Sequence, residues 1–89
     1  MNYIEQIKSK LEKEAKVHGG LLDLYTLLVF TKGEDTTLKN VHDAWAIWKN
    51  FRMPEHRSLI PFSELSVEVQ ELDRSYMEAI VKVAKEMNR

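Results

Sequence analysis

A nearly continuous apolar run from Leu21 to Phe30 is the feature that most limits how this chain can fold. The run reads LLDLYTLLVF, and only Asp23 and Thr26 interrupt it. A helix that is apolar on almost every side is typical of the buried centre of a bundle. A strand is possible on periodicity alone, but leucine dominates the run and no second strand-like segment exists to pair with it. We therefore expect a central helix. The run is also well short of the ~20 residues that span a bilayer, so we expect no membrane span.

Three other segments repeat apolar residues at the three- and four-residue steps of a helix. The first covers about residues 2–16 and carries Ile4, Ile7, Leu11 and Ala15. We expect Gly19-Gly20 to end it, because glycine adopts the left-handed conformation that helix ends often need. The second of these segments follows the central apolar run and starts near Asp35-Thr36-Thr37, whose side-chain oxygens suit a helix N-cap.

The last two helices are separated by a segment bounded by prolines. The helix carrying Trp45 and Trp48 should end by Met53, because Pro54 follows. Ser66 is a plausible N-cap for a long final helix with an apolar stripe formed by Val69, Leu72, Tyr76, Ile80, Val83 and Met87. The sequence thus predicts one all-α domain over residues 1–89, a bundle of about four helices with a Pro-bounded loop between the third and the last.

Composition and motifs exclude several functions. The 89-residue chain has no cysteine and a formal net charge of −1, which rules out a thiol nucleophile and argues against general nucleic-acid binding. No hydrolase, metalloprotease or phosphate-loop motif is present, and His18, His42 and His56 have no metal-site spacing. We expect a non-enzyme without cofactor or metal. A charged, amphipathic N-terminus and the absence of cysteine lead us to expect a cytoplasmic protein.

Aromatic and basic residues supply the candidate binding positions. Trp45 is expected in the core, whereas Trp48 and Tyr25 are candidates for stacking on a flat ligand. His42 either contacts a ligand or bonds a backbone carbonyl. Arg74 is either paired on an outer face or clamps a phosphate. The complete set of candidate ligand contacts is His42, Trp48, Lys49, His56, Arg57, Arg74 and Tyr25.

One stretch resembles a known family, the RyR domain, a small repeat found in ryanodine receptors and in bacterial and phage proteins. The matching residues are Val41-His42-x-x-Trp45, Lys49, His56-x-x-Leu59-Ile60-Pro61-Phe62-x-x-Leu65-Ser66, Glu68 and Asp73-Arg74, within about residues 38–84. The resemblance implies a helical module without catalytic activity. It further implies binding or sequestration of a nucleotide-derived signalling molecule, as by a sponge-like anti-defence protein of a phage.

A second function class stays open beside ligand binding. The chain could be a protein-interaction or oligomerisation module without a small-molecule ligand. A domain this small with 44% apolar residues can leave one apolar stripe uncovered, so we expect a homo-oligomer, most simply a dimer. Leu21, Leu24 and Leu28 are the expected contact residues.

Overall fold

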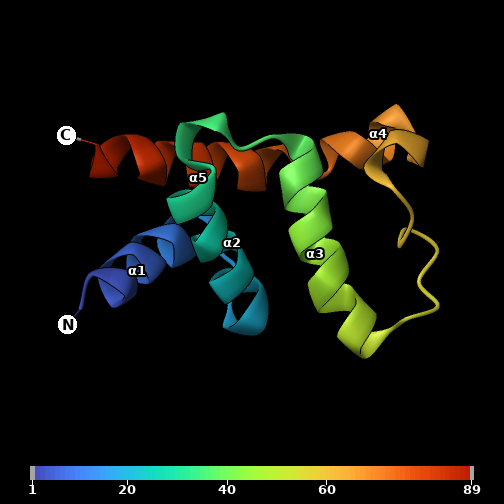
Figure 1. Cartoon of the computed structure of the whole chain (residues 1–89), viewed down its shortest axis with the longest axis horizontal. Coiled ribbons are helices and arrows are strands. Elements are labelled where there is room, and N and C mark those ends of the chain that lie inside the picture. Colours follow the sequence, from blue (N-terminus) through green and yellow to red (C-terminus); the bar gives the residue numbers. More distant parts are fainter. Residues whose placement is uncertain (1, 89) are drawn as a thin grey trace.

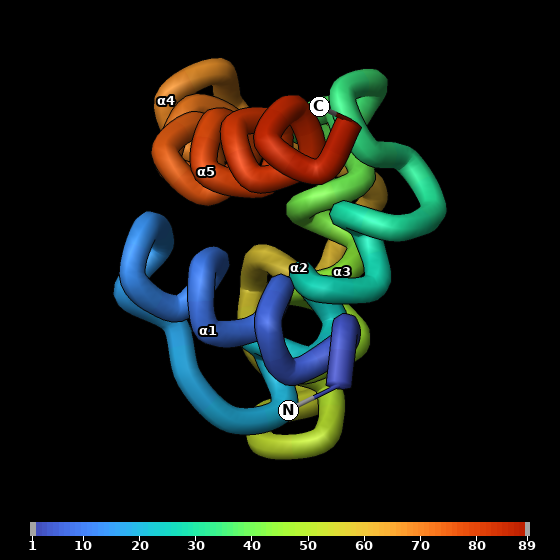
Figure 2. The backbone as a smooth tube through the Cα atoms, turned by 90° about the vertical axis from the view of Figure 1, so that its left-hand side faces the viewer, coloured from blue at the N-terminus to red at the C-terminus, as the bar shows by residue number. Residues whose placement is uncertain are grey.

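The apolar run forms most of a helix at the centre of the fold, as predicted. The computed structural model describes residues 2–88, and all of its regular structure in that range is helical. The elements are α1 (Tyr3–Ala15), α2 (Gly19–Thr31), the 3-10 helix η1 (Gly33–Asp35), α3 (Leu38–Arg52), the 3-10 helix η2 (Phe62–Glu64), α4 (Val67–Glu71) and α5 (Arg74–Met87). In Figure 1, α5 runs along the top of the view, with α1 and most of α2 below it, and the view from the side (Figure 2) shows α5 above α1. The all-α prediction is confirmed.

Helix α1 ends earlier than the glycine pair suggested. Asn2 caps its start by accepting a hydrogen bond from the Glu5 N–H at 2.9 Å. Its C-cap is Lys16, which takes the left-handed conformation at φ 54° although it carries a side chain. Gly19 and Gly20 instead begin α2, and Gly19 has a φ of +64°. The prediction that these glycines end the first helix was therefore wrong.

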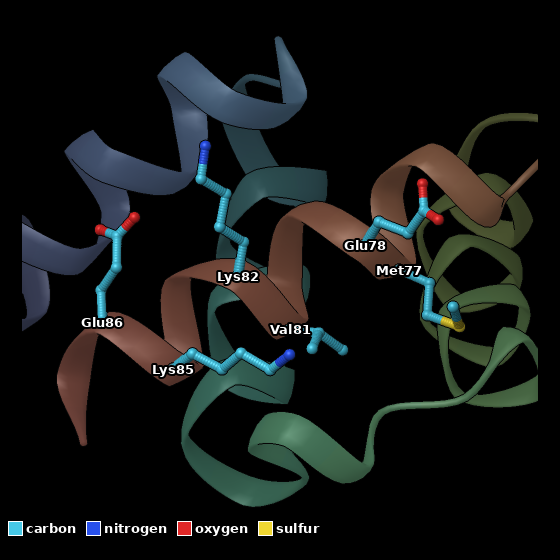
Figure 3. A pocket seen from close by; sticks show the side chains of 6 residues that line it. All are labelled: Met77, Glu78, Val81, Lys82, Lys85 and Glu86. Atoms are coloured by element: carbon cyan, nitrogen blue, oxygen red, sulfur yellow. The ribbon is translucent and has the colours of Figure 1, made fainter. Parts of the chain in front are cut away.

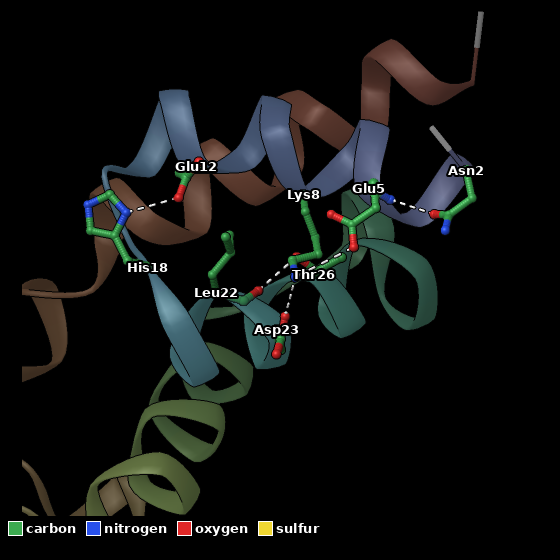
Figure 4. A network of polar contacts seen from close by, with 8 residues as sticks. All are labelled: Asn2, Glu5, Lys8, Glu12, His18, Leu22, Asp23 and Thr26. Carbon is green, nitrogen blue, oxygen red and sulfur yellow. Dashed lines mark hydrogen bonds and ion pairs between the residues drawn. The ribbon is translucent and has the colours of Figure 1, made fainter.

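The junction between α1 and α2 is held by polar contacts (Figure 4). Lys8 lies 2.9 Å from the Asp23 carboxylate, and the hydrogen bond between them raises the pKa of Lys8. His18 contacts Glu12 at 3.0 Å. The Asp23, His18 and Glu12 side chains are largely exposed, so these contacts contribute little to stability.

Helix α3 begins where its capping residues predicted. The Thr37 side chain accepts from the Asn40 N–H, and the Asn40 side chain accepts from the Thr37 N–H at 2.9 Å, which closes a capping box. The helix ends at Arg52. The segment 53–61 then returns along α3 toward η2, as the yellow trace in Figure 1 shows.

The predicted long final helix is broken into two. Ser66 caps α4 as expected, through a 3.3 Å bond from the Val69 N–H. The chain then turns at Leu72 and Asp73 before α5 begins. The break rotates Leu72 out of the predicted stripe, so its side chain is 72% exposed.

The core forms where α1, α2, α3 and α5 meet. Its largest fully buried side chains are Tyr25, Leu11, Ile80, Val41 and Val83. Helices α1 and α5 run antiparallel, because Lys10 pairs with Glu86 at 3.8 Å while Glu14 pairs with Lys82 at 3.0 Å. Among residues 2–88, no helix is both long and apolar enough to cross a membrane.

Candidate functional site

A small pocket forms where α3, the 53–61 segment and the break between α4 and α5 meet. We call it the Asp73 pocket; it encloses about 250 Å³. Its lining residues are His42, Trp45, His56, Ser58, Val69, Leu72 and Asp73. Trp45 was expected to be committed to the core, but it is only half-buried and forms a wall of this pocket. The 53–61 segment explains the difference, because it places the His56 ring against Trp45 at the surface of the helical core.

Aromatic contacts hold the walls of the pocket together. The His56 ring meets the Trp45 indole edge-on, with centroids 5.3 Å apart, and the His42 ring stacks on Trp45, with centroids 5.8 Å apart and an interplanar angle of 28°. His42 is buried, and its Nε2 donates to the Ile60 carbonyl at 2.8 Å. His42 therefore fastens the 53–61 segment to α3, which is the structural alternative that the sequence left open.

The hydrogen bonds also assign the protons of both imidazoles. A carbonyl oxygen can only accept, so neutral His42 carries its proton on Nε2. His56 Nδ1 accepts from the Ser58 N–H at 3.0 Å, so neutral His56 also carries its proton on Nε2. Both histidines were predicted ligand contacts, and both line the Asp73 pocket.

Asp73 is the acidic group of the pocket, and sequence reasoning did not select it. It occupies the N-cap position of α5, yet its side chain makes no capping hydrogen bond. The carboxylate is half-buried, and this desolvation raises its pKa, while the nearby His42 acts in the opposite direction. The sequence predicted Asp73 inside one long final helix, because its place at a helix start and its lack of a partner depend on the tertiary fold.

Tyr25 lies behind this region, in the core. Its side chain is completely buried and its ring packs against Tyr76, with centroids 5.6 Å apart. Its hydroxyl has no hydrogen-bond partner within residues 2–88. Burial raises the pKa of the Tyr25 phenol far above its ordinary value, and the charge of Asp73 adds to the shift. A ring enclosed in this way cannot stack on a ligand, so the predicted role of Tyr25 is not compatible with the structure.

Trp48 and Lys49 lie away from the Asp73 pocket, toward the start of α2. A methyl group built on Gly20 would lie 3.5 Å from the Trp48 indole, so this ring packs against the α2 backbone. The Arg52 guanidinium lies 4.9 Å and the Lys49 ammonium 5.7 Å from the ring centroid. The predicted stacking surface is therefore occupied by cations of the same helix.

The remaining predicted cations do not converge on a phosphate. Arg74 Nη2 donates to Glu71 Oε1 at 3.1 Å, and this hydrogen-bonded ion pair lowers the pKa of Glu71. The pair is one turn apart on an outer face, which is the structural alternative for Arg74. Arg57 is exposed. The Asp73 pocket has an acidic group and two imidazoles in its lining but neither Arg57, Arg74 nor Lys49.

An exposed apolar surface lies on another side of α3, which we call the α3 surface. It contains a groove of about 390 Å³ between α3 and the 59–61 segment. The lining residues of the groove are His42, Asp43, Ala46, Ile47, Asn50, Leu59, Ile60 and Pro61. Ile47 is 58% exposed at the groove, and Phe51, one turn further along α3, is 89% exposed. We define the α3 surface as this groove together with Phe51.

The expected contact residues on α2 are not free for an oligomer interface. Leu21, Leu24 and Leu28 are partly buried and pack against the core. Leu27 is the α2 leucine that is exposed. The apolar surface that the composition predicted is present, but it lies on α3 and the following segment.

Other hollows of the molecule have no comparable chemistry. A shallow trough of about 570 Å³ runs along α5, and all of its lining side chains come from that helix (Figure 3). Lys82 and Glu86 in this trough are already paired with α1. Within the described residues 2–88, no three His, Cys, Asp or Glu side chains are grouped so that they could hold a metal ion.

Comparison with known proteins contradicts the assignment to the RyR domain. One family model matches residues 1–85, and it is described as a domain of unknown function, DUF7701; no RyR domain matches. No curated protein and no solved structure matches the chain. The RyR prediction was therefore wrong. Two of the residues that carried it have structural roles: His42 holds the 53–61 segment, and Arg74 pairs on an outer face. The match covers nearly the whole chain, including α1 and α2, and the chain belongs to the DUF7701 family.

Proposed function

We propose that the protein is a non-catalytic interaction module that forms a symmetric homodimer through the α3 surface. The observation that carries the proposal is the exposure of Phe51 and Ile47, two large apolar side chains one turn apart on the same side of α3. Single exposed apolar residues are ordinary on protein surfaces, but a contiguous patch marks an interaction site. Ile60, 39% exposed, extends the patch onto the neighbouring segment.

The shape of the surface favours a second copy of the chain as the partner. A twofold interface brings the same patch of each subunit together, so the patch must be complementary to itself. The α3 surface combines a protruding ring, Phe51, with an apolar groove beside Ile47 and Ile60. Phe51 of one copy can fill the groove of the other, and the twofold axis repeats the contact.

The rim of the surface is suited to a specific contact. Asp43 borders the groove and pairs with Lys39 at 2.8 Å on the exposed face of α3. An apolar centre with a polar rim is the usual anatomy of protein interfaces. In a dimer, both charges stay at the edge, where they select orientation more than they add affinity.

Light scattering over a concentration series tests the proposal. The chain has a mass of 10.5 kDa, and we expect the apparent mass to approach twice that value as the concentration rises to hundreds of micromolar. A substitution of Ile47 by lysine should restore the monomer mass without unfolding the domain. A wild-type protein that keeps the monomer mass over the whole series would rule the dimer out.

Binding of a nucleotide-derived signal, with the anti-defence role that it would serve, stays a prediction. Its predicted cations lie apart, with Arg74 paired to Glu71 and Lys49 over Trp48. Phosphate recognition normally needs several converging donors, so the geometry supports the interaction module better. Calorimetric titration with cyclic dinucleotides separates the two, because micromolar binding would favour the ligand hypothesis.

A further inference from the structure

The Asp73 carboxylate has no structural partner, so it is free to contact a ligand. An aspartate at a helix N-cap ordinarily accepts a hydrogen bond from the first turn, and Asp73 does not. Within residues 2–88 its carboxylate forms no hydrogen bond and no ion pair, although the residue is half-buried in a concave pocket. Desolvating a carboxylate without a partner is unfavourable, so the folded chain tolerates a cost at this position.

The surroundings of Asp73 suit a positive charge. Trp45 and His56 form an aromatic wall of the same pocket, with their rings 5.3 Å apart. An indole ring attracts a cation placed over its face. Nearby basic residues do not fill this role, because Arg74, next in sequence, is held by Glu71.

We propose that the Asp73 pocket binds a small organic cation, an ammonium or guanidinium group, with Asp73 as its counter-ion and Trp45 and His56 as its aromatic wall. The cation supplies N–H donors to the carboxylate, and its alkyl part lies against Val69 and Leu72, which complete the lining. The pocket encloses about 250 Å³, which suits a short amine but not a nucleotide. The linings of this site and of the α3 groove share only His42, and the cation site does not use Ile47, Phe51 or Ile60.

Two sources can present such a group: a free amine or the Lys or Arg side chain of another protein. The experiment therefore titrates ¹⁵N-labelled protein with butylammonium and butylguanidinium as free cations, and with N-acetyl-lysine and N-acetyl-arginine methylamides as side-chain forms. Butanol is the neutral control of similar shape. The signals to follow are the Trp45 indole N–H and the His56 ring. For a ligand of this size we expect a Kd of about 1 mM.

The expected results are specific to charge and to Asp73. Butylammonium or butylguanidinium should bind about ten- to a hundred-fold more tightly than butanol, as a charge-assisted hydrogen bond provides. Asp73→Asn should abolish this preference, whereas Asp35→Asn, the same change at an exposed site outside the pocket, should keep it. Stronger shifts with the methylamides would identify a protein side chain as the source, and stronger shifts with the free cations a small molecule.

Two outcomes overturn the proposal. The first is the absence of Trp45 and His56 shifts with all four cations at 10-fold the expected Kd. The second is a wild-type protein that binds butanol as tightly as butylammonium, a comparison that needs no variant and stays decisive if Asp73→Asn does not fold. Neither outcome bears on the dimer, because self-association is measured without ligand and through different residues.

Discussion

Replacing Phe51 by serine separates the stability of the fold from the stability of the proposed dimer. The ring is 89% exposed in a single copy, so its removal should change the unfolding free energy of the monomer by no more than about 0.5 kcal/mol. In the dimer the ring is buried, and complete burial of a phenylalanine contributes about 1.5–3 kcal/mol. The twofold axis repeats the contact, so the loss is about 3–6 kcal/mol, and the dimer dissociation constant should rise by about a hundredfold or more.

Sedimentation equilibrium measures the dissociation constant, and thermal unfolding at low concentration measures the fold. Val67→Ser is the matched control, because Val67 is 67% exposed but lies on α4, outside the α3 surface. The control should leave the dissociation constant unchanged. If Phe51→Ser leaves self-association intact, or if it lowers monomer stability by several kcal/mol, the reasoning from its exposure is refuted.

Other substitutions test the interior and the pocket. Asp73→Asn should raise the unfolding free energy at neutral pH. The folded-state pKa of Asp73 lies above its ordinary value of 3.8, so the stability of the wild type decreases as the pH rises from that value through the raised pKa. The variant should lack this decrease in a pH series of urea titrations. A variant less stable than the wild type at neutral pH would contradict the desolvation argument. Tyr25→Phe should stabilise the domain by about 1 kcal/mol, since it removes a buried hydroxyl without a partner; a loss in chemical denaturation would show that the hydroxyl is satisfied. Ile80→Ala should destabilise by about 2–5 kcal/mol, because Ile80 is fully buried, and a calorimetric midpoint unchanged from the wild type would place Ile80 outside the core.

Cation binding should also depend on pH if the pocket acts as proposed. Acid protonates Asp73 and removes the counter-ion. The affinity of butylammonium should therefore fall in the NMR titration as the pH is lowered from neutral through the raised pKa of Asp73. A rise over that range would assign the attraction to a different group.

Local signals predicted the fold well. The capping residues Thr37 and Ser66 start helices as expected, and the apolar run forms α2. The break at Leu72 and Asp73 was missed because no proline or glycine marks it and the apolar stripe continues through it. The end of α1 was misplaced because Lys16 takes a left-handed conformation that usually favours glycine.

The candidate site was harder to predict, because it depends on where the 53–61 segment packs. Both tryptophans lie on neighbouring faces of one helix, and only the returning segment decides that Trp45 lines a pocket while Trp48 packs against α2. In the sequence Asp73 looks like an interior residue of one long final helix, and its position at a helix start and its lack of a capping bond emerge only in the folded chain. The sequence offered a pairing of Arg74 with a glutamate four residues away, and the structure pairs it instead with Glu71, three residues before it.

Isotope-filtered NMR on a mixture of labelled and unlabelled protein tests the central claim most directly, because it detects contacts between copies. The account predicts intermolecular NOEs from the Phe51 ring to the methyl groups of Ile47 and Ile60 at concentrations where the dimer forms. Ile47 and Phe51 lie one turn apart on α3 in a single copy, and the isotope filter removes such internal contacts because it detects only NOEs between a labelled and an unlabelled copy. Intermolecular NOEs confined to α1 or α2, or none at millimolar concentration, would contradict it.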